Sequence, residues 1–447
     1  MNTTKIKERI GHLLIMVMSV LLLELKYSEQ PPLIRTLYGV VVTFLVIMQY
    51  ALFRKHKLVV LGSLFLIREP NIFFVLSTSD VAIIAYVLLE LRRLKLKLSI
   101  FKEPLPVFLI YLILSSLIIY MVTSNVPLES LKNFYVIELL LFYFFIRSVI
   151  SHEKVDDFLL EVSRRILLLF SFSSLWLFIR YGPEIVSGGI LYFTDPTNYY
   201  FSSIYRSYFS FYYKDVNYFV SGLILITGIY LVLISNKKNS SSGRKAIYIF
   251  LPALFTFLSL SRTGVLVLSL LLFLYLVLTK MSSRILIIGV VCLILITSLS
   301  IGLLSNIYHI FEVYKQRFAK IGEDPRITIF KSSIRYMNEN ADKLIFGVGR
   351  MNMKKELERY LPFSSHIGHN DFLTIIFENG LIGFFLFMMI HATIMVKVLR
   401  SSSLKLIIIY CIWLFPQFVL DVFLAPHSII GMIYLLMKAN RKGRLIT

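Results

Sequence analysis

The sequence predicts an all-α, polytopic integral membrane protein with about 12–14 transmembrane helices, counted from apolar runs long enough to cross a bilayer. Of the 447 residues, 57% are hydrophobic and only 16% are charged, and the mean hydropathy is +0.76. That balance excludes an ordinary soluble domain. The basic residues fall in short clusters between the apolar runs, which is typical of membrane loops.

The apolar runs define candidate spans in chain order. They are residues 10–26, 34–53, 105–123, 133–150, 166–180, 216–235, 246–260, 264–280, 285–304, 372–396, 404–424 and 427–437. The stretch 58–91 is long enough for two crossings, but Arg68-Glu69-Pro70-Asn71 interrupts it, so a re-entrant hairpin is the alternative. Either arrangement adds an even number of crossings and leaves the orientation of the other spans unchanged.

The basic clusters assign the sides of the membrane. They are Lys5/Lys7/Arg9, Arg54/Lys55/Lys57, Arg92/Arg93/Lys95/Lys97, Lys154/Arg164/Arg165, Lys237/Lys238/Arg244/Lys245, Lys280/Arg284, Lys397/Arg400/Lys405 and Lys438/Arg441/Lys442/Arg444, and they fall on alternate loops. Cytoplasmic loops are enriched in Lys and Arg, so we expect these loops and both termini to be cytoplasmic. The net charge of +21 therefore reflects membrane orientation, and we expect no nucleic-acid partner.

Two longer segments lie on the opposite face, and we expect a single membrane domain over residues 1–447 that carries them as periplasmic loops. Residues 181–215 are rich in tyrosine, and residues 305–370 hold 11 Lys and Arg against 7 Asp and Glu. Loops longer than about 60 residues escape the charge rule, so the basic loop does not contradict the topology. Within it, the spacing of Ile327, Phe330, Ile334 and Met337 predicts an amphipathic helix with these residues on its apolar face.

A cluster of ionisable residues opens the span that follows the long loop. His366 and His369 precede Asn370 and Asp371, and imidazole is the side chain best suited to transfer a proton near neutral pH. Asn370 or Asp371 is the candidate N-cap, and the helix N-terminus favours a bound anion. A metal site formed by His366, His369 and Asp371 is a weaker alternative, because no further ligand cluster accompanies them.

The same span continues with Glu378, Gly380 and Gly383. A carboxylate two turns inside a span is costly, so we expect Glu378 to pair with an arginine or to cap a neighbouring element. The two glycines predict close helix packing, and Gly347-Val348-Gly349 in the preceding loop predicts a turn.

Three arginines lie on the outer side, where the orientation rule does not explain them. Arg206 is in the tyrosine-rich segment, Arg262 lies in the short connection Ser261-Arg262-Thr263-Gly264 between two spans, and Arg326 is in the long loop. Guanidinium groups bind phosphate through a forked, permanently charged surface, so all three are candidate pyrophosphate ligands. Interfacial anchoring or ion pairing is the alternative for each.

Taken in order, these motifs resemble the bacterial O-antigen polymerase and O-antigen ligase superfamily. The resemblance rests on Ser261-Arg262-Thr263-Gly264, on Arg326 followed by Gly347-Val-Gly349, and on His369-Asn370-Asp371-Phe372-Leu373 with Glu378-Asn-Gly380-Leu-Ile-Gly383. Arg206 followed by Asp215-Val216-Asn217 is a further match, although Val216 replaces the proline usual in that family. By motif, the resemblance covers about residues 200–395, judged on order and spacing.

The resemblance implies a metal-independent glycosyltransferase without a cofactor, which takes its glycan donor from undecaprenyl pyrophosphate at the periplasmic face of the inner membrane. His369 would accept the proton of the attacking hydroxyl, which inverts the anomeric centre, and Arg206, Arg262 and Arg326 would bind the pyrophosphate. His366, Asn370, Asp371, Glu378 and Asn217 would support them.

We favour a polymerase that joins repeat units of an O-antigen or capsule. An O-antigen ligase that transfers glycan to lipid A–core is the near alternative, and a lipid-linked oligosaccharide flippase is the alternative from another class. No repeated halves of the kind found in many transporters are evident in the sequence. The expected partners are the lipid-linked donor and acceptor and membrane lipid, with a chain-length regulator protein as a further candidate.

Overall fold

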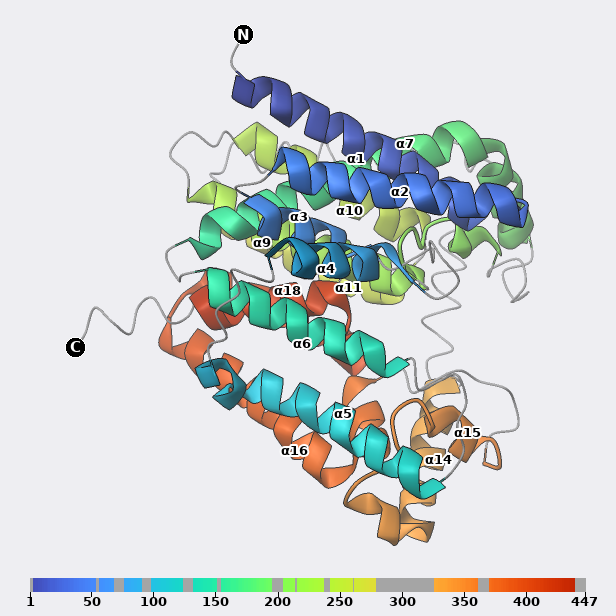
Figure 1. Cartoon of the computed structure of the whole chain (residues 1–447). Helices are drawn as coiled ribbons and strands as arrows, with labels where there is room; N and C mark the ends of the chain where they lie inside the picture. Colours follow the sequence, from blue (N-terminus) through green and yellow to red (C-terminus); the bar gives the residue numbers. More distant parts are fainter. Residues whose placement is uncertain are drawn as a thin grey trace, which may run out of the picture. The chain divides into compact units, whose positions relative to one another are not determined.

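The computed structural model describes twelve stretches of the chain, and they form two compact units. The described residues are 3–53, 56–67, 76–90, 98–123, 132–150, 154–194, 204–213, 215–236, 242–259, 261–278, 325–360 and 370–438. The first unit comprises Met1–Arg93 and Glu153–Lys315, and the second comprises Leu94–His152 and Gln316–Thr447. Helices account for the regular structure of the described residues, with no strand among them, so the all-α prediction is confirmed (Figure 1).

The first unit is built around one fully apolar helix. Its helices are α1 (Thr3–Tyr27), α2 (Pro32–Leu52), α3 (Lys57–Leu64), α4 (Thr78–Glu90), α7 (Val155–Thr194), α9 (Val216–Ser235), α10 (Ser242–Leu258) and α11 (Arg262–Leu278). Helix α9 contacts α7, α10 and α11, and nearly all of its residues are buried. A helix that is apolar on every side is stable away from water, either inside other protein or in a bilayer, and here the neighbouring helices surround it.

Helix α7 is longer than the span that the sequence predicts. Its 40 residues correspond to about 60 Å, twice the thickness of a hydrocarbon core. The helix continues through Pro183 to Thr194, so the predicted span 166–180 is only its middle. The tyrosine-rich segment 181–215 therefore begins as helix.

The ambiguous stretch 58–91 forms a pair of short helices. Helix α3 has 8 residues and α4 has 13, or about 12 and 20 Å, and both are too short to cross the membrane. The backbone N–H of Ser79 donates to the carbonyl of Ile67 at 3.2 Å, and the Lys57 ammonium pairs with the Glu90 carboxylate. Because the two ends are tied together, the structure favours the re-entrant hairpin over two crossings.

The second unit contains α5 (Pro104–Thr123), α6 (Lys132–Val149), α14 (Pro325–Glu339), α15 (Met353–Leu357), α16 (Asp371–Arg400), α17 (Leu404–Leu414) and α18 (Pro426–Lys438). Short 3-10 turns η2 (Leu98–Lys102), η7 (Ala341–Leu344) and η8 (Phe415–Phe418) complete it. Helix α5 packs against α6 and α16, and α18 packs against α6, α16 and α17. Helices α14 and α15 belong to the long loop and contact the N-terminal part of α16.

Helix α14 exists as predicted, but most of the predicted apolar face is exposed and other residues of the helix are buried. Ile327, Phe330 and Ile334 are 38%, 50% and 40% exposed, whereas Ile329 and Tyr336 are 3% and 4% exposed. The periodicity identified an amphipathic helix correctly. It did not identify the buried face, because the helix also buries Ser332 and Ser333 and apolar residues occur on both sides.

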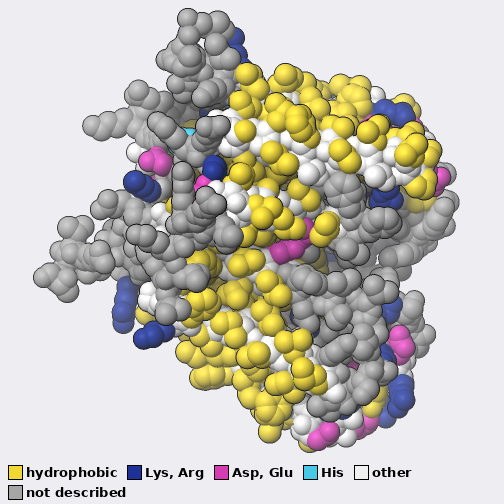
Figure 2. All heavy atoms as spheres, in the orientation of Figure 1, with side chains coloured by type: hydrophobic (Ala, Val, Ile, Leu, Met, Phe, Trp, Pro, Cys, Tyr) yellow, Lys and Arg dark blue, Asp and Glu magenta, His cyan; other side chains and the backbone are white. Residues whose placement is uncertain are grey.

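The apolar surface agrees with a multi-pass membrane protein. Five helices among the described residues are long and apolar enough to cross a membrane: Arg9–Tyr27, Pro32–Leu52, Val155–Gly189, Val216–Ser235 and Asp371–Arg400. Shorter apolar helices occur at Pro104–Ile119, Tyr248–Leu258, Arg262–Leu278 and Leu404–Phe418. On the face seen in Figure 2, hydrophobic side chains cover most of the described surface, and Lys and Arg lie mainly toward its edges.

Candidate functional site

The segment that carries Arg206 is anchored to the end of helix α1. The ammonium of Lys26 donates hydrogen bonds to the Ser210 hydroxyl at 2.9 Å and to the Tyr213 carbonyl at 2.7 Å. The Tyr27 hydroxyl also accepts a hydrogen bond from the backbone N–H of Phe211 at 3.1 Å. Aromatic side chains of the segment are buried against the first unit, and Phe209 is 0% exposed. Residues 204–213 are therefore fixed to the helical bundle of the first unit.

Arg206 contacts the two spans on which the other motif residues lie. Its Nε donates to the carbonyl of Ser259 at 3.3 Å, and one terminal nitrogen donates to Asn217 Oδ1 at 3.2 Å. The Ser261 hydroxyl donates to the same oxygen at 2.7 Å. Asn217 Oδ1 therefore joins the outer segment to the starts of α9 and α11. A guanidinium has five N–H donors, so three of those on Arg206 have no partner among the described residues.

Local capping explains why the motif residues lie at helix ends. Asp215 caps α9, because its carboxylate accepts from the backbone N–H of Asn217 at 2.6 Å. Ser261 caps α11 in the same way through the N–H of Gly264 at 2.9 Å. A Cβ on Gly264 would lie 2.7 Å from the Val220 side chain, so glycine permits the close contact between α11 and α9.

Arg262 is the first residue of α11 and is half-buried. Helix α10 ends at Leu258, so the connection between the two helices is the short turn that the sequence predicts. Arg206 thus reaches the turn that bears Arg262, and the structure brings Arg206, Asn217 and Ser261 into one hydrogen-bonded cluster of the first unit.

In the second unit, Asn370 holds the start of α16. Its Oδ1 accepts from the backbone N–H of Leu373 at 3.0 Å, and its Nδ2 donates to the carbonyl of Phe418 at 2.9 Å. Asn370 is therefore the N-cap, as one of the two predicted alternatives requires. Because one amide serves both bonds, the residue directly after His369 is tied to a second element of the unit.

Asp371 is an internal tether. The carboxylate is 1% exposed and accepts from the backbone N–H groups of Val422 and Phe423 at 3.1 and 2.8 Å, next to the Asp421 carboxyl. It links α16 to the segment before α18. The helix end predicted to bind an anion thus carries a carboxylate of its own, and no group of three or more His, Cys, Asp or Glu side chains suited to a metal occurs among the described residues.

Helix α16 is broken at Gly380, where φ is 64° and ψ is −168°, a conformation open almost only to glycine. The part after the break, residues 381–400, spans about 30 Å, the thickness of a hydrocarbon core. Glu378 lies two residues before the break. The expectation that Gly380 serves helix packing was wrong, whereas Gly383 does lie 3.0 Å from the Tyr111 ring on α5, measured from an added Cβ.

The predicted turn Gly347-Val348-Gly349 docks on this break. The N–H groups of Val348 and Gly349 donate to the carbonyls of Phe377 and Glu378 at 3.1 and 2.9 Å. A Cβ on Gly347 would lie 2.4 Å from the Glu378 carbonyl, so only glycine allows the two backbones to meet. The two glycine motifs of the sequence thus form one backbone junction, with the loop supplying donors to carbonyls at the helix break.

Two side chains complete the junction. The Tyr111 hydroxyl donates to the carbonyl of Asn379 at 2.7 Å, directly before the break. The carboxylate of Glu378 is 6% exposed and lies near the backbone of Met351 and Met353 and near Arg350. Glu378 therefore lies against the start of α15, and its pairing with an arginine or capping of a neighbour stays a prediction.

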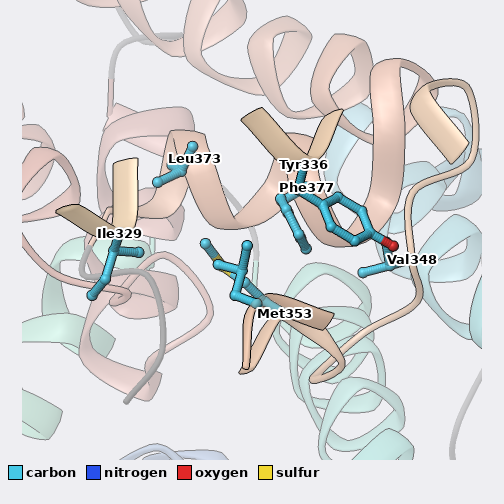
Figure 3. Close-up of a cluster of buried hydrophobic side chains, with 7 residues drawn as sticks. Ile329, Tyr336, Val348, Met353, Leu373 and Phe377 are labelled. Atoms are coloured by element: carbon cyan, nitrogen blue, oxygen red, sulfur yellow. The ribbon is translucent and has the colours of Figure 1, made fainter. Parts of the chain in front are cut away.

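The long loop has a small core that rests on α16. Figure 3 shows its buried side chains converging from α14, the glycine turn, α15 and the first turns of α16. They are Ile329, Tyr336, Val348, Met353, Leu357, Leu373 and Phe377. Since Leu373 and Phe377 belong to α16, the loop folds against the helix that the histidine motif opens.

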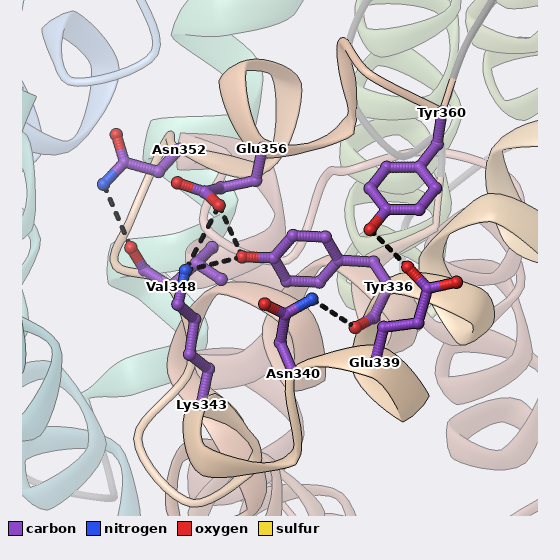
Figure 4. Close-up of polar contacts among 8 residues, drawn as sticks. All are labelled: Tyr336, Glu339, Asn340, Lys343, Val348, Asn352, Glu356 and Tyr360. Carbon is purple, nitrogen blue, oxygen red and sulfur yellow. Dashed lines mark hydrogen bonds and ion pairs between the residues drawn. The ribbon is translucent and has the colours of Figure 1, made fainter.

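Polar contacts reinforce this core (Figure 4). The Lys343 ammonium donates to the Tyr336 hydroxyl at 2.8 Å and pairs with Glu356 at 3.3 Å, and Tyr336 in turn donates to Glu356. At the same end of α14, the Tyr360 hydroxyl donates to Glu339 at 2.6 Å. That bond, helped by the Arg335 guanidinium, lowers the pKa of Glu339.

The structure places the predicted site residues unequally. His366 and His369 lie outside the described residues, and so does the side chain of Arg326, which is the second residue of α14. Arg206, Asn217 and Arg262 lie in the first unit, whereas Asn370, Asp371 and Glu378 lie in the second.

Sequence reasoning missed the residues that hold this machinery in place. Lys26 and Tyr111 come from distant helices and bond backbone carbonyls far away in the sequence, those of Tyr213 and Asn379. Each is a single polar residue near the end of, or within, an apolar run, and a snorkelling or interfacial role explains such a residue equally well. In the sequence, only the Glu-Asn-Gly pattern marked the place that Tyr111 contacts.

Together, the helices and the loop docked on a broken span define a multi-pass, all-α membrane protein with a folded extramembrane segment. Residues 247–388 match the sequence model of the O-antigen ligase family. That segment belongs to the O-antigen ligase and polymerase superfamily, and the resemblance seen in the motifs is confirmed. No curated protein matches the chain.

Proposed function

We propose that this protein is a glycosyltransferase that polymerises undecaprenyl-pyrophosphate-linked repeat units into a surface polysaccharide. The observation that supports this most is the family match over residues 247–388, which contains Arg262, Arg326 and His369. Arg206 and Asn217 lie outside that segment, yet both are hydrogen-bonded to its first turn or to each other. A cluster built from three motif positions favours a common ligand.

In the proposed reaction, the arginines bind the donor pyrophosphate. The glycosidic bond between the anomeric carbon and the pyrophosphate oxygen breaks, and negative charge develops on the leaving oxygen. Guanidinium groups held in place beforehand stabilise that charge without reorganising. Arg206 suits this role because Asn217 and Ser259 fix its orientation while other N–H donors remain. Arg262 and Arg326 are the further proposed ligands.

His369 is the proposed general base. The hydroxyl of the acceptor sugar attacks the anomeric carbon on the face opposite the leaving group, so the centre is inverted, and the hydroxyl proton passes to the imidazole. Undecaprenyl pyrophosphate leaves with the bonding electrons. Asn370 supports this assignment, since it anchors the position next to His369 to both α16 and Phe418.

The proposed setting is the inner membrane, with both termini cytoplasmic and the reaction on the periplasmic face. This follows from the basic clusters on alternate loops. The substrates would be the lipid-linked donor and acceptor, with their polyprenyl chains among the apolar helices. A chain-length regulator protein is a proposed partner, and His366, Asp371 and Glu378 are proposed supporting residues.

The ligase is the second candidate, because O-antigen ligase is the description of the matching family. It would transfer finished glycan to lipid A–core with the same residues. The two functions leave different products when the enzyme fails. Without a polymerase, single repeat units still reach lipid A–core, whereas without a ligase none is attached.

Replacing His369 by Ala in cells that use this protein tests both proposals. A polymerase whose base is lost should give surface glycan one repeat unit long, with the protein still present in the membrane. Lipid A–core that carries no repeat unit would identify a ligase. Long chains at normal abundance would contradict the role of His369 as the base.

A second experiment tests the arginine fork. Arg262→Lys keeps the charge but removes the planar fork, so glycan synthesis should fall at least about tenfold if a bidentate phosphate contact is lost, a bond of roughly 1.5–3 kcal/mol. Arg35→Lys is the matched control, because Arg35 is an exposed arginine near the start of α2. Equal activity of the two variants would show that Arg262 only anchors the protein at the interface.

A further inference from the structure

A separate cavity of about 190 Å³ lies within the second unit, at the ends of α5, α6, α16 and α18. Its polar lining residues are Glu103, Tyr143, Arg147, Thr393 and Lys397. None of them belongs to the motifs on which the proposed function rests. Lys397 is in the last turn of α16, and Arg400 ends that helix, so the cavity is at the end of the unit that the basic clusters assign to the cytoplasm.

One carboxylate in the cavity is already satisfied. Glu103 accepts from Arg147 Nε, which lies 3.2 Å from both carboxylate oxygens, and from a terminal nitrogen of the same guanidinium. The Tyr143 hydroxyl also donates to Glu103. Arg147 therefore neutralises Glu103, and the pair contributes no net charge to the cavity.

The remaining charge comes from Lys397. Its side chain is half-buried, and no carboxylate lies within 4.0 Å of its ammonium among the described residues. Burying an ammonium without a counter-ion is unfavourable. The cavity thus carries one net positive charge. Thr393, one turn before Lys397 on α16, also lines it, but the Thr393 hydroxyl donates to the Met389 carbonyl at 2.7 Å.

The volume of the cavity and its apolar surroundings limit the class of ligand that it can bind. Pockets for drug-sized molecules measure about 300–1,000 Å³, so this cavity is too small for an oligosaccharide but suits one phosphodiester group. Leu105, Ile390 and Leu436 form its apolar wall. The outer side of α16 is apolar at the same level, where Val396 and Leu399 are 40% and 57% exposed, and acyl chains would pack well there.

We propose that this cavity binds a phosphate ester with one negative charge, supplied by the headgroup of an anionic phospholipid. The phosphate would pair with Lys397 and accept a hydrogen bond from Arg147, while the acyl chains lie along α16. Basic sites between transmembrane helices on the cytoplasmic side are known to bind anionic headgroups. The proposal is independent of the glycosyltransferase reaction and of every residue assigned to it.

Lipid binding to the purified full chain in detergent tests the proposal. Bound lipid is counted by native mass spectrometry during titration with dioleoyl phosphatidylglycerol, and dioleoyl phosphatidylcholine serves as the zwitterionic comparison. We expect Lys397→Gln to weaken phosphatidylglycerol binding about fivefold, since one basic residue near the surface contributes about 1 kcal/mol. Lys397→Arg should bind within about twofold of the wild type, and Arg400→Gln should not change binding.

Two further arms keep the test decisive if Lys397→Gln folds poorly. Leu436→Phe fills the cavity without changing its charge and should also reduce binding. Glycerol 3-phosphate tests whether the bound phosphate belongs to a lipid or to a soluble ester. If this soluble ester competes at concentrations equal to those of the lipid, the cavity is a phosphate site for soluble ligands. Equal binding of both lipids to the wild type, or unchanged binding in both cavity variants, would overturn the proposal.

Discussion

The junction between the long loop and α16 makes the sharpest prediction for stability, through Gly380→Ala. An alanine at φ 64° and ψ −168° costs about 1–3 kcal/mol in backbone strain. The added Cβ would also lie 2.3 Å from the Ile345 carbonyl and 2.5 Å from the Gly347 nitrogen, so the loop must move. That movement breaks the Val348 and Gly349 hydrogen bonds to α16, each worth about 1 kcal/mol net. The expected loss is about 3–5 kcal/mol.

Proteolysis and intrinsic fluorescence measure this loss. Trypsin can cleave the docked loop at Lys343, Lys354 and Lys355 once the loop detaches from α16. A loss of about 3 kcal/mol raises the population of the detached loop about a hundredfold, so trypsin should cut there up to about a hundredfold faster. The buried Trp413 reports unfolding of the second unit. Gly182→Ala is the control, because nothing lies within 4 Å of an added Cβ there. A Gly380→Ala protein that melts and resists trypsin like the control would refute the described junction.

Two further predictions concern single hydroxyl groups. Tyr111→Phe should cost about 1–3 kcal/mol, because it leaves the Asn379 carbonyl unpaired at the helix break. Tyr38→Phe is the control, because the Tyr38 hydroxyl has no hydrogen-bond partner among the described residues, and equal melting temperatures of the Tyr111→Phe protein and this control would contradict the Tyr111–Asn379 bond. Tyr360→Phe should lower the melting temperature of the loop only above about pH 4. The hydrogen bond from Tyr360 is the main cause that lowers the pKa of Glu339 in the folded protein. The stability that this bond contributes is therefore present above the unfolded pKa of about 4.3 and is lost as the pH falls through the folded pKa. A difference between the two proteins that does not change from pH 7 to pH 3 would exclude this linkage.

The predictions that succeeded depend on local sequence. Asn370 caps α16, as one of the two predicted alternatives requires, because its side chain reaches a backbone group three residues away. The apolar runs within the described residues likewise become helices, since backbone groups in a membrane must be satisfied within the same segment. These features need no knowledge of what packs against them.

The predictions that failed depend on distant partners. The buried face of α14 packs against Leu373 and Phe377 of α16, and the helical hydrophobic pattern alone does not reveal which face that is. Gly380 lies three residues before Gly383, a spacing that suggests a glycine used in helix packing. It breaks the helix instead, and the Gly347 turn approaches its backbone. This contact joins residues more than thirty positions apart, so the periodicity of hydrophobic residues along the helix does not predict it.

The sequence by itself determined the class of the protein, the apolar helices found among the described residues and the family that its motifs resemble, because all of these follow from composition and short-range spacing. Only the tertiary structure decided that Asn217 joins Arg206 to Ser261, that the glycine turn docks on a broken helix, and that Lys397 lines a cavity. Each of these is a contact between separate helices, and it exists only after the chain has packed.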